Sequence, residues 1–118
     1  MDQADYVSVI AKNDNNKFPM VKQYRHAINK YTLEFPSGML EKNETPILCA
    51  KKEVFEETGY KISKIKLLSK SSADVGRLRN HSYLFYAKIG SNIVNLNTET
   101  NIEVILYTKK QIINLIKT

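Results

Sequence analysis

The sequence predicts an α+β or mixed-sheet α/β sandwich rather than a doubly wound parallel sheet. Two observations carry this prediction. Strand-like segments lie both before and after one well-capped helix, and a short second helix, residues 109–116 with Thr108 as its cap, ends the chain. At 118 residues the chain is the size of one domain. We therefore expect a single domain over residues 1–118, with no linker and no internal repeat.

The strands are predicted from β-branched and aromatic content and from alternation of apolar and polar residues. They cover residues 6–11, 18–24, 32–35, 62–68, 81–87 and 102–107. A turn at residues 13–16 is expected to join the first two strands as a hairpin. Pro36, Ser37 and Gly38 interrupt regular structure and are expected to open a loop that lasts until Thr45.

The central helix is predicted over residues 46–58. Thr45 is a good N-cap, and Pro46 stands where the first helical turn needs no amide donor. Gly59 is placed to end the helix in a left-handed conformation. One arc of this helix should face the core, through Ile47, Ala50 and Val54.

Composition limits the classes of function that need considering. No apolar run approaches the roughly 20 residues that span a bilayer, and the first residues lack the features of a signal peptide, so a cytoplasmic protein is expected. The formal net charge of +6 suits an anionic partner, but the lysines are dispersed, which favours a solvated basic surface over nucleic-acid binding. Cys49, the single cysteine, is predicted to be an inert helix thiol.

An acidic face on the central helix is the main chemical signal. Glu53, Glu56 and Glu57 stand at positions i, i+3 and i+4, so their carboxylates share an arc of roughly 100°. One ammonium, that of Lys52, does not neutralise three carboxylates. A hard divalent cation such as Mg²⁺ would do so through oxygen ligands. The alternative is a solvated helix face with ordinary i, i+4 charge pairs.

The surrounding stretch GMLEKNETPILCAKKEVFEETGY resembles the Nudix box, G-x5-E-x7-R-E-U-x-E-E-x-G-U, in which U is a bulky apolar residue. The positions that match are Gly38, Glu44, Glu53, Glu56, Glu57 and Gly59, with Val54 and Tyr60 at the apolar positions. Lys52 stands where the family has arginine. It keeps the positive charge but lacks the bidentate fork of a guanidinium.

The resemblance implies a Nudix-like α/β/α sandwich with a mixed β-sheet, in which the box binds a diphosphate through divalent metals. The implied cofactor is Mg²⁺, with Mn²⁺ as a substitute. The implied principal metal ligands are Glu53 and Glu57. Glu56 would be a further ligand or would contact a metal-bound water, and the backbone carbonyl of Ser37 or Gly38 would be another ligand. Glu44 would orient the site, and Lys52 would take the place of the arginine that holds a box glutamate. Catalysis would be displacement at phosphorus by water.

The preceding stretch VKQYRHAINKYTLEFPSG is similar to the corresponding part of ADP-ribose pyrophosphatases. On that analogy Arg25 would contact a substrate phosphate or ribose, since a guanidinium suits bidentate phosphate binding. Glu34 aligns with the glutamate of that family's motif and is a second candidate for substrate binding. An exposed arginine at a strand end is the alternative for Arg25.

Two further candidates come from loops. The subfamily supplies a catalytic acid from a late loop, at a position that is Thr100 here, and the nearest acid is Glu99. Arg77, in the loop of residues 74–80, lies where the family places substrate-selecting residues. A plain flexible basic loop is an equal alternative for Arg77.

The resemblance as a whole implies a Mg²⁺-dependent pyrophosphohydrolase that cleaves a nucleoside diphosphate linked to another group. ADP-ribose or a related nucleotide sugar is the expected substrate. The alternatives are hydrolysis of nucleoside triphosphates or dinucleoside polyphosphates, and a non-catalytic Nudix module that binds nucleotide or RNA. The expected partner is therefore a small nucleoside diphosphate derivative, and a homodimer is left open.

Overall fold

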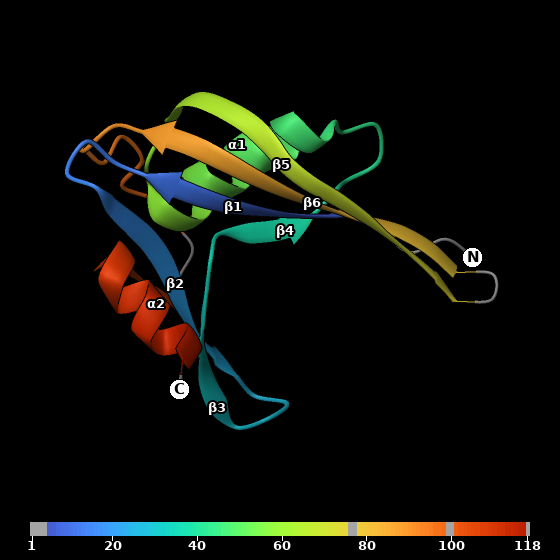
Figure 1. Ribbon diagram of the computed structural model, residues 1–118, viewed down its shortest axis with the longest axis horizontal. Coiled ribbons are helices and arrows are strands. Elements are labelled where there is room, and N and C mark those ends of the chain that lie inside the picture. The colour runs from blue at the N-terminus through green and yellow to red at the C-terminus, as the bar shows by residue number, and fades with distance from the viewer. Residues whose placement is uncertain (1–4, 76–77, 99–100, 118) are drawn as a thin grey trace.

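The computed structural model describes residues 5–75, 78–98 and 101–117 (Figure 1). Within these residues the chain forms seven strands and two helices. They are β1 (Tyr6–Lys12), β2 (Lys17–Arg25), β3 (Lys30–Glu34), β4 (Ser37–Met39), α1 (Pro46–Thr58), β5 (Ile62–Val75), β6 (Leu78–Ile89), β7 (Ile102–Thr108) and α2 (Lys109–Lys117). Every predicted strand and both predicted helices are present; α1 has its predicted bounds, and the bounds of the other elements are shifted.

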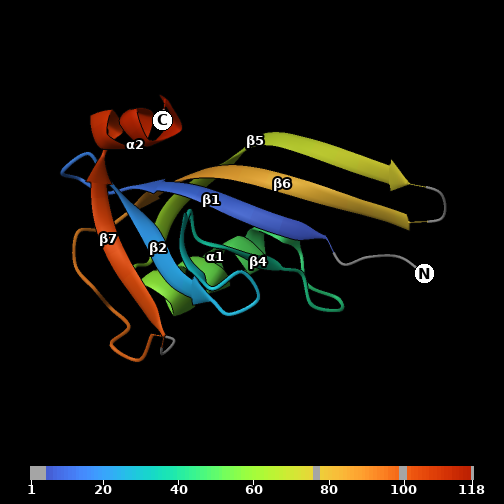
Figure 2. The ribbon, with the colours of Figure 1, turned by 90° about the horizontal axis from the view of Figure 1, so that it is seen from below.

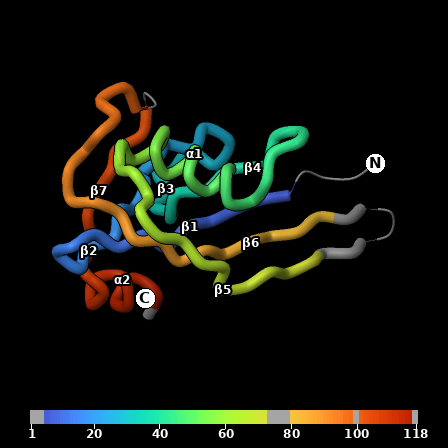
Figure 3. Tube along the Cα trace, turned by 90° about the horizontal axis from the view of Figure 1, so that it is seen from above, coloured from blue at the N-terminus to red at the C-terminus, as the bar shows by residue number. Residues whose placement is uncertain are grey.

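The strands divide into two sheets. The larger has the order β4-β1-β6-β5 and the smaller has the order β3-β2-β7. β1 and β6 pair in parallel, whereas the other neighbours are antiparallel, so the larger sheet is mixed. Figures 2 and 3 show α1 and α2 on opposite sides of β1, β5 and β6. The predicted α/β sandwich with a mixed sheet is confirmed.

The predicted hairpin of the first two strands is wrong. The turn itself forms, because Oδ1 of the buried Asn13 accepts hydrogen bonds from the backbone N–H groups of Asn15 and Lys17, at 2.9 and 3.0 Å. After the turn, however, the chain leaves one sheet for the other: β1 pairs with β4 and β6, while β2 pairs with β3 and β7. Local turn chemistry does not reveal that both edges of β1 are taken by distant strands.

The predicted loop of residues 36–45 contains a strand that the sequence did not indicate. Residues Ser37–Met39 pair antiparallel with β1, with Gly38 opposite Val7. Three residues are too few to show an alternating pattern, so this strand exists only through its partner. β5 and β6 are also longer than predicted, because their polar outer halves pair with each other in a hairpin that extends away from the helices (Figure 1).

The central helix has its predicted bounds and caps. The hydroxyl of Thr45 accepts the amide of Leu48 at 3.2 Å, and Gly59 adopts φ +82° while its amide donates to the carbonyl of Phe55 at 3.1 Å. The buried side of α1 differs from the prediction, since Ile47 is 46% exposed. The buried stripe consists of Cys49, Ala50, Val54 and Thr58, so Ala50 and Val54 are buried as predicted. It packs against the apolar face of the larger sheet, which includes Val7, Val9, Phe85, Ala87 and Ile89.

The terminal helix α2 begins with a reciprocal cap. The hydroxyl of Thr108 accepts the amide of Gln111 at 3.2 Å, and the side-chain oxygen of Gln111 accepts the amide of Thr108 at 2.8 Å. The predicted cap at Thr108 is therefore confirmed. In the described part of the chain, no helix combines the length and the apolar character that crossing a bilayer would require.

Candidate active site

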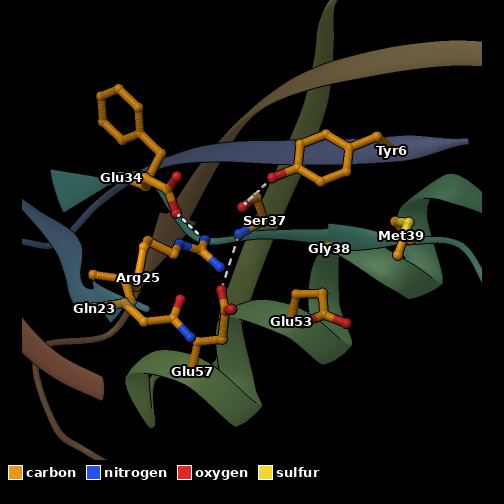
Figure 4. A pocket seen from close by; sticks show the side chains of 11 residues that line it. Tyr6, Gln23, Arg25, Glu34, Ser37, Gly38, Met39, Glu53 and Glu57 are labelled. Carbon is orange, nitrogen blue, oxygen red and sulfur yellow. Dashed lines mark hydrogen bonds and ion pairs between the residues drawn. The ribbon is translucent and has the colours of Figure 1, made fainter. Parts of the chain in front are cut away.

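A cavity of about 280 Å³ lies where α1 faces β4 and the ends of β2 and β3 (Figure 4). Its lining unites residues from five elements and the segment between β3 and β4. The lining residues are Tyr6, Val21, Gln23, Arg25, Glu34, Phe35, Ser37, Gly38, Met39, Glu53 and Glu57. Acidic, basic, amide and apolar side chains thus meet in one place, and several of them were predicted to belong to the site.

Glu57 is tied to the start of β4. Its Oε1 accepts a hydrogen bond from the backbone N–H of Ser37 at 2.9 Å, across 20 positions of sequence. The bond orients one carboxylate oxygen and links the helix to the strand (Figure 4). Glu57 therefore has a defined position in the cavity, as a metal ligand requires.

Glu53 lies directly against Gly38. A Cβ at position 38 would stand 2.4 Å from Cδ and 2.7 Å from Oε1 of Glu53, which is closer than non-bonded atoms approach. The side chain of Glu53 is only 14% exposed. Glycine at the first position of the box is thus explained by packing: any side chain there would displace the Glu53 carboxylate.

Lys52 organises a second group of carboxylates beside the cavity. Its Nζ lies 2.8 Å from Oε2 of Glu44, 3.5 Å from Glu41 and 3.9 Å from Glu53. The backbone N–H of Glu41 donates to Oε1 of Glu44 at 3.0 Å. This hydrogen bond, and then the bond from Lys52, lowers the pKa of Glu44, while the bond to Glu44 raises the pKa of Lys52. The pairing of Lys52 with a box glutamate is therefore present, although the residue is not arginine.

Cys49 is buried behind these carboxylates. Its thiol donates to the carbonyl oxygen of Met39 at 3.7 Å. Burial raises the pKa of the Cys49 thiol to about 12, and the negative charges of Glu44 and Glu53 add to the rise. A thiol in this state stays protonated at neutral pH and is a poor nucleophile, in agreement with the predicted inert thiol.

Arg25 and Glu34 form an ion pair at the other end of the cavity. Nη2 of Arg25 lies 2.8 Å from Oε2 of Glu34, and their side chains are 43% and 39% exposed. The pair bridges β2 and β3 (Figure 4). Both residues were candidates for substrate binding, and the structure places both in the same cavity as Glu53 and Glu57.

Other predicted site residues either do not line the cavity or are not among the described residues. Glu56 is exposed and is not among the residues that line the cavity. Glu99, Thr100 and Arg77 lie outside the described residues. Their predicted roles stay predictions.

Sequence reasoning overlooked five residues of the lining: Tyr6, Val21, Gln23, Phe35 and Met39. Gln23 had a usable signal, because it stands two positions before Arg25 on the same strand and so shares its face. Tyr6 and Met39 had none, since they reach the cavity only through the pairing of β1 with β4.

A divalent metal in the cavity would find two carboxylates as protein ligands. Among the described residues, no three acidic, histidine or cysteine side chains converge as a metal-binding cluster. Two carboxylates, those of Glu53 and Glu57, do line the cavity. Mg²⁺ commonly takes one or two protein carboxylates and completes its shell with waters and substrate phosphates. The residues present fit that mode of binding.

Comparison with known proteins agrees with the geometry. The NUDIX domain family model matches residues 2–115. A methanol dehydrogenase activator of Bacillus methanolicus is 34% identical over 114 residues, which are 94% of this chain and 62% of that protein. An ADP-ribose pyrophosphatase of Bacillus subtilis (strain 168) is 44% identical over 59 residues, which are 50% of this chain and 32% of that protein. The matches thus span less than two thirds of the length of these relatives.

Solved structures support the same fold. An ADP compounds hydrolase superposes with a TM-score of 0.80 at 15% identity, covering 98% of this chain and 63% of that one. A NUDIX hydrolase from Nitrosomonas europaea gives a TM-score of 0.75 at 20% identity, covering 94% of this chain and 76% of that one. At these identities the likeness establishes the fold alone.

Proposed function

The chain belongs to the Nudix hydrolase family, and on this premise we propose that it is a Mg²⁺-dependent pyrophosphohydrolase acting on ADP-ribose or a related nucleotide sugar. One observation carries the proposal: Glu53 and Glu57 share a cavity with the ion pair of Arg25 and Glu34. The substrate is the partner we propose. A homodimer and a cytoplasmic location stay predictions.

Arg25 is the proposed phosphate-binding residue. Its guanidinium is half-exposed within the cavity, so a phosphate oxygen can approach it without removing a buried group. A substrate phosphate would compete with Glu34 for the same N–H donors, because both are anionic acceptors. Glu34, once released from Arg25, is placed to accept hydrogen bonds from ribose hydroxyls.

Glu53 and Glu57, with a backbone carbonyl of Ser37 or Gly38, are the groups that would hold the divalent ion. When bound, the ion would neutralise phosphate oxygens and lower the pKa of the attacking water. The chain keeps these two carboxylates in place by two contacts: the Ser37 amide orients Glu57, and the backbone at Gly38 limits where Glu53 can lie. The ion pair of Glu44 with Lys52 links the segment before α1 to the helix next to these carboxylates.

The proton of the attacking water needs an acceptor. Glu34, Glu53 and Glu57 are the carboxylates among the described lining residues, and each already has another proposed role. Glu56 and Glu99 therefore remain the proposed candidates for the general base. Glu56 is on the exposed side of α1, so it would have to act at the edge of the bound substrate.

A panel of ADP-ribose, sugar nucleotides, dinucleoside polyphosphates and nucleoside triphosphates tests the proposal. We expect release of a nucleoside monophosphate from ADP-ribose or a sugar nucleotide in Mg²⁺, and no release after chelation. Preference for a triphosphate or a dinucleoside polyphosphate would instead support a Nudix hydrolase that acts on that substrate. Tight nucleotide binding without turnover would instead support a non-catalytic module.

A second candidate function is activation of a dehydrogenase, favoured by the 34% identity to the methanol dehydrogenase activator over 94% of this chain. Addition of the protein to the methanol dehydrogenase of Bacillus methanolicus, with and without Mg²⁺, tests this function. An unchanged rate of methanol oxidation would exclude it for that enzyme.

A further inference from the structure

We propose that Tyr6 and Met39 form the surface on which the base of the nucleotide lies, and that they give the site a preference for purine nucleosides. This proposal rests on the proposed hydrolase function and specifies its substrate contact. We call the pair the Tyr6–Met39 platform.

The lining of the cavity is uneven in polarity. Val21 and Phe35 are apolar but buried or half-buried, so they offer little surface to a ligand. By contrast, Tyr6 is 37% exposed and Met39 is 64% exposed. The remaining apolar surface available in the cavity is therefore concentrated on these two side chains.

The two residues are neighbours in the fold. Tyr6 and Met39 are direct partners in the antiparallel pairing of β1 with β4. Side chains directly opposite each other on antiparallel strands lie on the same face of the sheet, with Cβ atoms about 4.5–5.5 Å apart. An exposed aromatic ring and a polarizable thioether thus lie side by side, a combination suited to a flat, apolar ring.

The platform is connected to the metal-binding side of the cavity. The hydroxyl of Tyr6 donates to Oγ of Ser37 at 2.7 Å, and the amide of the same serine donates to Glu57 at 2.9 Å (Figure 4). One residue therefore sets the position of both the aromatic ring and a proposed metal ligand. A base on the platform would be held at a defined separation from the diphosphate.

The chemistry of the two ends matches a nucleoside diphosphate. Arg25 supplies a cation for phosphate, and Glu53 and Glu57 supply carboxylates for a divalent ion. The platform supplies the two most exposed apolar side chains among the described lining residues. Stacking on an aromatic side chain tolerates any base. The larger purine ring can cover more of the platform, so a purine nucleotide is the expected preference.

Steady-state kinetics with ADP-glucose and UDP-glucose test the platform. Tyr6→Ala should raise the KM for ADP-glucose by about 5- to 100-fold, as expected for loss of one base stack, and should leave kcat close to wild type. The KM values of the two substrates should converge, because the discriminating surface is gone. Tyr6→Phe keeps the ring but loses the hydrogen bond to Ser37, so it should raise the KM for ADP-glucose less than Tyr6→Ala does and should keep the preference for ADP-glucose. Met39→Leu keeps the bulk of the side chain and should likewise raise this KM less than Tyr6→Ala does.

Ile47→Ala is the matched control, since Ile47 is a similarly exposed apolar residue outside the cavity. It should change neither KM. An unchanged KM in Tyr6→Ala, or an equal rise for both substrates, would overturn the proposal. Thermal melts of each variant exclude unfolding as the cause.

Failure of the proposed hydrolase function would be visible separately, as absence of turnover in the wild type. In that event, calorimetric titration with ADP and UDP in Mg²⁺ still tests whether the Tyr6–Met39 platform binds the base. Weaker ADP binding in Tyr6→Ala but not in Ile47→Ala would support the platform. Equal ADP affinity in both variants would refute it.

Discussion

Two groups of carboxylates lie on and beside α1, and they differ in what balances their charge. Glu44 is 2.8 Å from the ammonium of Lys52 and accepts the backbone N–H of Glu41. Glu53 and Glu57 lie against the backbone of β4 and line the cavity, and Lys52 is farther from Glu53, at 3.9 Å. Glutamates in the same part of the fold therefore have different expected roles. Glu44 should contribute to stability, and Glu53 and Glu57 should contribute to activity.

Glu57→Gln should show the largest effect on activity. Loss of a residue that only supports a metal ligand usually lowers activity by about 10- to 100-fold. Because Glu57 is itself a proposed ligand, we expect kcat/KM to fall by more than this. Thermal stability without metal should hold or rise slightly, because an acidic neighbour is removed and the amide oxygen of glutamine still accepts the Ser37 N–H.

Glu103→Gln is a matched control for that variant, because Glu103 is an exposed glutamate on β7 with the same change of charge. Glu56→Gln, assayed in parallel under saturating Mg²⁺, reports whether that residue contributes to catalysis. Activity of Glu57→Gln near the wild-type level would refute the proposed metal site.

Gly38→Ala should come next in size. The added Cβ would lie 2.4 Å from Cδ of Glu53, so the carboxylate must move away from its position in the cavity. We expect an activity loss of about 10- to 100-fold with a much smaller change in melting temperature, since the displaced atoms belong to a flexible side chain. Gly90→Ala is the control, because a Cβ there would meet nothing within 4 Å. Equal effects of both variants would contradict the role of Gly38.

Lys52 connects the two groups, so its variants sharpen the comparison. Lys52→Arg should retain or raise activity, because a planar fork can bind Glu44 in bidentate fashion. Lys52→Gln should lower the melting temperature by a few degrees, as expected for a partly exposed ion pair worth about 1 kcal/mol or less. Kinetics and thermal melts of both variants provide the measurement. A large loss of activity in Lys52→Arg would show that the site is built around lysine.

The smallest effect should be the pH dependence of Glu44. Its pKa lies below the ordinary value of 4.5 in the folded state, so its carboxylate stabilises the fold above that pH and loses this contribution as pH falls through the folded pKa. Glu44→Gln should therefore lower the melting temperature at about pH 7, and the difference from wild type should shrink at about pH 3. A difference that is constant across this range would show that Glu44 stabilises the protein by packing rather than by charge.

The sequence by itself determined α1 and the identity of the residues it presents. Thr45, Pro46 and Gly59 act within one turn of the helix ends, so their effect can be predicted without knowing any distant contact. The spacing of Glu53 and Glu57 is likewise a local property, which is why the box resemblance identified residues that do line the cavity.

Tertiary structure alone decided what those residues face. β4 exists because β1 pairs with it, and this pairing brings Gly38 against Glu53 and Tyr6 beside Met39. The partition of β1 and β2 into different sheets, which the turn at Asn13 did not reveal, likewise depends on β6 and β7 from the far end of the chain. Helix caps act between near neighbours in sequence, whereas strand pairing selects among distant partners by the burial that the whole fold achieves.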